Sequence, residues 1–241
     1  SVDNSKKLLE NNTHLYDHLI SYDKNQGKGF ALREGIKKIS GEICLIQDAD
    51  LEYLPEDNYN KLLKPFQNNK ADVVYGSRFK GEGSMRVLFF WHMVANKLIT
   101  LFSNFFSNLN FTDVETGYKL FRTDILKKIE LKENSFSFEI EVTQKIAKIK
   151  PKIMIFEVGV SYFGSTYSVL KKITFKDALT SFVCIVRYGL FSAAHDGGYV
   201  TPSSELNGFK LLQRQPESSI TRTLSKHYKA DEYSSVAIDP T

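Results

Sequence analysis

The sequence predicts an α/β domain, because short apolar runs alternate with amphipathic stretches along most of its length. Three runs have the length and composition of strands, at residues 43–46, 71–79 and 152–162. In addition, three acidic residues follow the first run at alternate positions. Polar side chains at the carboxyl end of a strand are typical of ligand sites in open α/β sheets.

Composition is that of an ordinary globular protein, with 42% hydrophobic and 25% charged residues. The net charge of +4 permits an anionic substrate or membrane surface, and no nucleic-acid partner is expected. Cys44 and Cys184 lie in apolar segments and form no Cys-x-x-Cys pair, which disfavours zinc and a disulfide framework. With no signal peptide at the start and no unbroken run of eighteen apolar residues, we expect a cytoplasmic protein.

The first forty residues contain two predicted helices and one predicted strand. Residues 3–5 (Asp-Asn-Ser) are typical of a helix N-terminus, and residues 15–22 contain strand-forming side chains. Residues 25–29 (Asn-Gln-Gly-Lys-Gly) then precede an amphipathic helix. Because N–H groups at a helix N-terminus favour anions, this turn is a candidate phosphate site. A flexible turn with an exposed lysine is the alternative.

The first apolar run ends in the acidic residues Asp48, Asp50 and Glu52. Their carboxylates point to one side if the chain stays extended. Three anions on one side repel unless a cation lies among them, and oxygen ligands of this kind suit Mg²⁺ or Mn²⁺. Such an ion usually shares its coordination with substrate phosphates, so a metal–diphosphate site is predicted here. A solvated turn can carry the same pattern.

A helix is predicted to begin at residues 53–55, since proline is favoured in the first turn, and to place Leu62, Leu63 and Phe66 in the core. The strand at residues 71–79 follows and brings Arg78 to its end. A guanidinium group in that position suits a phosphate or an acidic partner. A surface salt bridge is the alternative.

A long, mostly apolar helix is predicted over residues 86–110, and its polar interruptions argue against a membrane-spanning segment. Such a helix fits either core packing or a membrane interface. Another helix is expected to begin near Asp124, a candidate cap. In the helix after it, Glu139 and Glu141 flank one isoleucine, so we expect one to face a pocket and the other to face solvent.

The last predicted elements are the strand at residues 152–162 and an apolar helix over residues 175–191. Residues 195–241 are polar, with scattered serine and proline, and show no sustained apolar period. We therefore predict one domain over residues 1–194 and a loosely ordered tail over residues 195–241.

Five motifs occur in a fixed order. They are Asn-Gln-Gly-Lys-Gly at 25–29, Asp-Ala-Asp-Leu-Glu at 48–52, Gly-Ser-Arg-Phe at 76–79, Thr-Gly-Tyr-Lys-Leu-Phe-Arg at 116–122 and Phe-Glu-Ile-Glu at 138–141. Together they resemble the family 2 glycosyltransferases of the GT-A fold, above all the polyprenyl-phosphate or dolichyl-phosphate sugar synthases and their bacterial relatives. The resemblance covers about residues 1–190 and implies a mixed central sheet flanked by helices.

On the donor side, the resemblance implies a site for a nucleotide diphosphate sugar. Its expected residues are Lys28, Gly29, Asp48, Ala49 and Asp50. Asp48, Asp50 and Glu52 are expected to hold the Mg²⁺ or Mn²⁺ ion that bridges the diphosphate.

On the acceptor side, the resemblance implies a site for a polyprenyl phosphate or a related glycan. Its expected residues are Arg78, Arg86, Thr116 and Gly117. The expected catalytic residues are Asp50, Arg78 and Asp113.

The sequence departs from the family pattern at three places, of which the third is the tail after residue 195, since it matches no segment of the family. The family normally begins with a strand carrying Pro-x-Tyr-Asn-Glu and a second strand ending in Asp-Asp-Gly-Ser, so we expect this chain to lack those strands and to bind nucleotide poorly. The family's Gly-Arg-Thr-Tyr-Glu-Glu-Gly-Lys-Lys-Ile reads Gly-Ser-Thr-Tyr-Ser-Val-Leu-Lys-Lys-Ile at residues 164–173. This change removes an arginine, two acids and a glycine from the expected acceptor side.

The resemblance implies transfer of a hexose to a polyprenyl phosphate with inversion, at the cytoplasmic membrane face, where the helices at 86–110 and 175–191 would rest. Transfer to a soluble glycan hydroxyl is an alternative, for which Asp113 or Glu139 would be the general base. A catalytically silent binding module and a nucleotidyltransferase are further alternatives.

Overall fold

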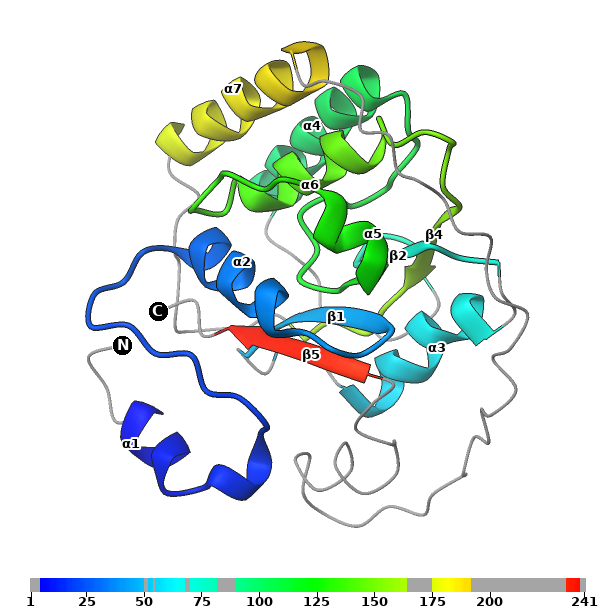
Figure 1. Ribbon diagram of the computed structural model, residues 1–241. Coiled ribbons are helices and arrows are strands. Elements are labelled where there is room, and N and C mark those ends of the chain that lie inside the picture. The colour runs from blue at the N-terminus through cyan, green and yellow to red at the C-terminus, as the bar shows by residue number, and fades with distance from the viewer. Residues whose placement is uncertain are drawn as a thin grey trace.

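The computed structural model describes residues 5–49, 52–53, 55–67, 70–81, 90–163, 175–191 and 233–238. Within them, a mixed five-stranded sheet has the order β4-β2-β3-β1-β5. Its strands are β1 (Ile43–Asp48), β2 (Val73–Ser77), β3 (Lys119–Arg122), β4 (Ile155–Gly159) and β5 (Tyr233–Ile238). Helices flank this sheet (Figure 1), so the predicted α/β architecture is confirmed.

The direction of the strands decides where polar side chains gather. β3 runs antiparallel to both β1 and β2, whereas β4 is parallel to β2 and β5 is parallel to β1. Consequently β1, β2 and β4 all end at the same edge of the sheet. That edge carries Asp48 at the end of β1 and Arg78 directly after β2, as expected for a ligand site in such a sheet.

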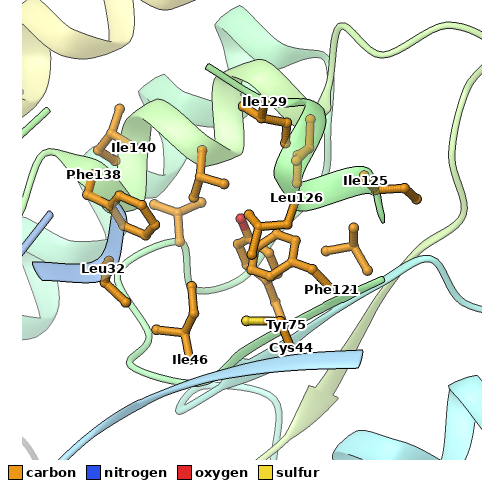
Figure 2. Packing of buried hydrophobic residues seen from close by; sticks show 14 of the residues in the cluster. Leu32, Cys44, Ile46, Tyr75, Phe121, Ile125, Leu126, Ile129, Phe138 and Ile140 are labelled. Carbon is orange, nitrogen blue, oxygen red and sulfur yellow. The ribbon is translucent and has the colours of Figure 1, made fainter. Parts of the chain in front are cut away.

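Buried side chains alternate between the two faces of the sheet. The helices are α1 (Ser5–Glu10), η1 (Thr13–Leu15), α2 (Lys28–Lys38), α3 (Pro55–Gln67), α4 (Phe90–Ser107), α5 (Thr123–Lys128), α6 (Phe138–Ile146) and α7 (Phe175–Phe191). On one face, Cys44 and Ile46 pack with residues of α2, α5 and α6 (Figure 2). On the other face, Ile43 belongs to a cluster with Leu62 and Phe66 of α3, as predicted.

The helices α4 and α7 lie side by side against α6 (Figure 1). On α6, the Gln144 amide donates to the Ser103 carbonyl oxygen at 3.0 Å, which fixes α4. Close approach of α7 depends on Gly189, because an added Cβ would lie 2.7 Å from Phe106 Cβ. These two long apolar helices therefore cover the outside of α6.

Two local predictions near helix ends and loops are wrong. Residues 15–22 form no strand, and Leu19 and Ile20 are each 37% exposed. None of the strands that the structure describes pairs with these residues. Asp124 does not cap α5, because the helix begins at Thr123 and its cap position is Arg122. Asp124 lies in the first turn, where a carboxylate still favours the helix dipole.

The expectation of a loosely ordered tail is wrong for six residues. Tyr233–Ile238 forms β5 and pairs with all of β1, with Ile43 opposite Tyr233 and Asp48 opposite Ile238. The rest of the predicted tail lies outside the described residues. Since β5 contains only two residues with long aliphatic side chains, its pairing partner decides its structure more than its own composition does.

Candidate active site

A buried ion-pair network surrounds Lys28 at the carboxyl end of β1. Its ammonium nitrogen lies 2.6 Å from Asp48 Oδ1 and 2.9 Å from Glu139 Oε1. The three residues come from the start of α2, the end of β1 and the start of α6. Burial opposes the charge on the ammonium group, but the Glu139 and Asp48 carboxylates outweigh it and raise the pKa of Lys28. The alternative of an exposed lysine in a flexible turn is therefore wrong, because Lys28 is a buried cation.

A second buried lysine completes this network. Lys119 on β3 is 0% exposed, and its Nζ donates to Glu139 Oε2 and, at 2.5 Å, to the carbonyl oxygen of Thr116. Burial would keep Glu139 protonated, but Lys119 and Lys28 outweigh it and lower the pKa of the carboxyl group. Glu139 is thus an anion held between two ammonium groups.

The expectation that either Glu139 or Glu141 faces solvent is wrong, because they are 2% and 0% exposed. Glu141 accepts hydrogen bonds from the backbone N–H groups of Lys132 and Glu133 at 2.8 to 2.9 Å. It also forms an ion pair with Lys145 at 2.6 Å. Glu141 therefore fixes the loop before α6, while Glu139 reaches the end of β1.

The loop before β3 comes close to Asp48 through its backbone. Gly117 N–H donates to the Tyr53 hydroxyl at 3.1 Å. An added Cβ on Gly117 would lie 2.6 Å from Asp48 Oδ2, so this approach requires glycine. Thr116 and Gly117, both predicted to line the pocket, are thus brought beside Lys119 and Asp48.

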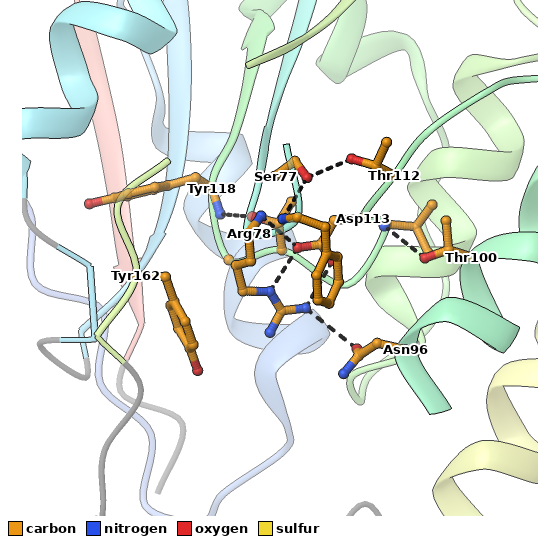
Figure 3. A network of polar contacts seen from close by, with 12 residues as sticks. Ser77, Arg78, Asn96, Thr100, Thr112, Asp113, Tyr118 and Tyr162 are labelled. Atoms are coloured by element: carbon orange, nitrogen blue, oxygen red, sulfur yellow. Dashed lines mark hydrogen bonds and ion pairs between the residues drawn. The ribbon is translucent and has the colours of Figure 1, made fainter. Parts of the chain in front are cut away.

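Arg78 and Asp113 form a second network at the end of β2 (Figure 3). Arg78 Nε donates to Asp113 Oδ2 at 2.7 Å, and Nη2 donates to Oδ1 at 2.8 Å. The Arg78 backbone N–H also donates to Oδ2, at 3.0 Å. Asp113 is 0% exposed, and this fork-like geometry holds the guanidinium plane in one orientation. Two of the three predicted catalytic residues therefore bind each other.

Neighbouring residues hold the Asp113 loop against the sheet. Glu157 on β4 accepts from the Thr112 backbone N–H at 2.8 Å and from the Asp113 N–H at 3.2 Å. The Asn96 side-chain oxygen on α4 accepts from Arg78 Nη2 at 3.4 Å. The Tyr162 ring centre lies 5.5 Å from the guanidinium carbon, close enough for a cation–π contact.

Of the remaining predicted site residues, the structure describes Gly29 and Ala49. An added Cβ on Gly29 would lie 2.3 Å from the Glu133 carbonyl oxygen, so this glycine is required for packing at the start of α2. Ala49 is exposed directly after β1. Asp50 and Arg86 lie outside the described residues.

The described residues provide part of a ligand set for a divalent cation. Within the ranges that the structure covers, no group of three histidine, cysteine or acidic side chains is arranged to hold a metal. Asp48 and Glu52 are nevertheless hard oxygen donors of the type that Mg²⁺ and Mn²⁺ prefer. Glu52 Oε2 accepts from the Tyr162 hydroxyl at 2.7 Å, which orients it. The donor set fits such an ion in type, with the third predicted ligand at Asp50.

Sequence reasoning missed Lys119 and Glu115. A lysine between apolar residues of a short strand was the available signal for the first, since a buried ammonium group needs carboxylate partners. Glu115 lies between Asp113 and Thr116, and its Oε1 is buried with no hydrogen-bond partner among the described residues. Burial and the nearby Glu139 carboxylate raise the pKa of Glu115 to about 7. No pattern in the sequence marks this residue.

The sequence of this chain matches that of a known protein family. A profile described as Glycosyl transferase family 2 matches residues 1–130. The low-salt glycan biosynthesis hexosyltransferase of Haloferax volcanii is 30% identical over 120 residues, which cover 48% of this chain and 28% of that protein. Polyprenol monophosphomannose synthase of Mycolicibacterium smegmatis is 26% identical over 148 residues, covering 60% of this chain and 52% of that protein. Dolichol-phosphate mannosyltransferase of Pyrococcus furiosus is 24% identical over 150 residues, covering 61% and 42%.

Solved structures agree on the fold. Glucosyl-3-phosphoglycerate synthase from Mycobacterium tuberculosis, in complex with Mn²⁺, uridine diphosphate and phosphoglyceric acid, superposes with a TM-score of 0.58. The match covers 78% of this chain and 64% of that one at 13% identity, so it supports the GT-A fold alone. The chain spans between 28% and 52% of the three curated relatives named above. Because the family profile covers more than half of the chain, the chain belongs to glycosyl transferase family 2.

Proposed function

We propose that this chain transfers a hexose, with inversion, from a nucleotide diphosphate sugar to a polyprenyl phosphate. The observation that carries the proposal is the meeting of Lys28, Asp48 and Gly117 at the carboxyl end of β1, the ligand-binding edge of such a sheet. Two curated relatives are named as a polyprenol monophosphomannose synthase and a dolichol-phosphate mannosyltransferase, which supports a lipid phosphate as acceptor.

The donor is proposed to bind at the Lys28 network, with Gly29, Ala49 and Asp50 beside it. A Mg²⁺ or Mn²⁺ ion held by Asp48, Asp50 and Glu52 would supply neutralisation of the charge on the leaving diphosphate. The chain's own residues orient the carboxylate of Asp48. Lys28 holds one oxygen of Asp48 at 2.6 Å, and Gly117 leaves room for the other.

The acceptor phosphate is proposed to bind beside Arg78 and Arg86, next to Thr116 and Gly117. A phosphate is already anionic, so its attack needs correct positioning more than a strong base. This agrees with the contacts of Asp113, whose two oxygens are occupied by Arg78. Asp113 then acts as a positioning residue that fixes the guanidinium group.

A lipid acceptor requires contact with a membrane, and two helices offer an apolar surface for it. We define the α4–α7 apolar face by its exposed residues Leu98, Leu101, Phe102, Phe105, Leu179, Phe182, Val183 and Leu190. On α4 they recur at the spacing of one helix side. Phe102 and Phe182 pack edge to face, with ring centres 5.4 Å apart, which joins the two helices into one surface. None of the described helices combines the length and apolar content needed to span a membrane. We propose that this face lies in the membrane interface.

The proposal is tested by hexosyl transfer from labelled UDP-glucose or GDP-mannose, with Mn²⁺, to a short polyprenyl phosphate. Asp48→Asn is expected to lower kcat/KM by about 100-fold or more, because it removes a charge at the donor site. Asp124→Asn, at an exposed carboxylate on α5, is the matched control and should leave transfer unchanged. Equal activity of Asp48→Asn and wild type, or transfer to soluble glycans but not to polyprenyl phosphate, would contradict the proposal.

A further inference from the structure

Glu115 is an acidic side chain that the protein places between two ion-pair networks without using it in either. One network joins Lys28, Asp48, Glu139 and Lys119, and the other joins Arg78 to Asp113. The charges of Glu139, Lys119, Arg78 and Asp113 all act on the Glu115 carboxyl group. Glu115 also belongs to the same loop as Gly117, whose backbone contacts Asp48.

The two networks are balanced without Glu115. Among the described residues that form them, three cations (Lys28, Lys119 and Arg78) face three anions (Asp48, Glu139 and Asp113). An ionised Glu115 would add an uncompensated negative charge to a partly buried side chain, which is costly because its Oε1 is shielded from water. The carboxyl group of Glu115 therefore has no charge partner left in these networks.

Other acids of this region show what a structural role looks like. Glu141 receives two backbone N–H groups and the Lys145 ammonium, and Glu157 receives the N–H groups of Thr112 and Asp113. In contrast, Glu115 Oε1 has no hydrogen-bond partner within the described part of the chain. An unsatisfied buried oxygen is unfavourable, and one that lies in the loop contacting Asp48 can be satisfied by a ligand bound there.

We propose that Glu115 binds the transferred hexose, with its carboxyl group hydrogen-bonded to a hydroxyl group of the sugar. This inference rests on the proposed function, because it places the diphosphate at Asp48. The hexose is bonded directly to that diphosphate and so lies within reach of the loop that contacts Asp48. A diphosphate oxygen carries no proton and can pair only with the protonated carboxyl group, whereas a sugar hydroxyl can pair with the protonated or the ionised form. A pKa near 7 lets the carboxyl group accept or donate such a bond at neutral pH.

The test compares the affinity for the nucleotide sugar with the affinity for the nucleotide alone. Titration calorimetry with Mn²⁺ gives the Kd of UDP, UDP-glucose, GDP and GDP-mannose. For each nucleotide, the quantity to compare is the Kd of the nucleotide alone divided by the Kd of its nucleotide sugar. Glu115→Ala is expected to lower this ratio by about 10-fold, the loss of one hydrogen bond to a charged or strongly polar group. Affinity for the bare nucleotide should stay within about twofold of wild type. Glu115→Gln, whose amide still forms hydrogen bonds, should restore part of the ratio.

Glu157→Gln is the matched control, because Glu157 holds the same loop through Thr112 and Asp113 without being the proposed sugar ligand. It should change both affinities by the same factor and leave the ratio as in wild type. A wild-type ratio in Glu115→Ala, or an equal fall in Glu157→Gln, would overturn the inference. No binding of any nucleotide by the wild type would overturn the proposed function itself and the inference with it.

Discussion

At the scale of single residues, Lys28 shows how the site combines stability with function. Taking an ammonium group out of water is unfavourable, so the burial of Lys28 depends on carboxylates on either side of it. Those carboxylates belong to β1 and α6, and the same ion pairs that orient Asp48 therefore join two distant elements. A site built this way is rigid before any ligand binds, which reduces the cost of ordering it later.

The raised pKa of Glu115 makes stability depend on pH. Between its ordinary value of 4.5 and about 7, the folded protein keeps a proton that the unfolded chain has released. The free energy of unfolding therefore falls as pH rises through this window. Glu115→Gln has no carboxyl group to titrate and so avoids that loss. We expect the free energy of unfolding of the variant minus that of wild type to be about 1–3 kcal/mol larger at pH 7.5 than at pH 5.

Urea unfolding of both proteins at the two pH values measures this difference. Asp124→Asn serves as the control for the loss of a carboxylate, because Asp124 lies exposed on α5. The result that would contradict the prediction is an equal stability difference between Glu115→Gln and wild type at both pH values.

At the scale of elements, α4 and α7 present one apolar face outward while their inner sides pack on α6. Phe105 is 78% exposed and Leu190 is 60% exposed, which is unfavourable in water over so large a connected surface. If this face rests in a membrane interface, Phe105→Glu and Leu190→Glu should each weaken partitioning into phosphatidylglycerol vesicles by about 10-fold.

Vesicle co-sedimentation measures this partitioning. Leu8→Glu is the matched control, because Leu8 on α1 is 61% exposed but does not belong to the α4–α7 apolar face. Equal partitioning of all three variants would show that this face does not contact the lipid.

At the scale of the whole molecule, the sequence predicts elements that carry their own signal. α7 and the start of α3 match the predicted residues, because apolar spacing and a first-turn proline specify them locally. β3 was not predicted, since its four residues include a lysine and an arginine. Lys119 can occupy a central strand only because Glu139, twenty residues later, neutralises it. β5 likewise depends on its pairing with β1, almost two hundred residues earlier.

The sequence predicts the types of residue in the candidate site better than it predicts the contacts between them. The acids after β1 and the arginine after β2 follow from strand ends, which the sequence shows. The bond between Arg78 and Asp113 links residues 35 positions apart, and no local pattern specifies it. The role of Glu115 depends on which neighbours are already paired, and only the folded arrangement reveals that.

The central claim is that the end of β1 binds a nucleotide diphosphate sugar together with a divalent cation. Thermal unfolding of the wild type with Mn²⁺ and each of several UDP- and GDP-sugars, with and without a chelator, tests it most directly. A ligand at 100 times its Kd stabilises the folded state by about 2.7 kcal/mol, which is a readily measured shift. We predict a shift that appears with sugars of one nucleotide and is lost with the chelator. A folded protein that shows no shift with any of them, or the same shift with the chelator present, would contradict the account.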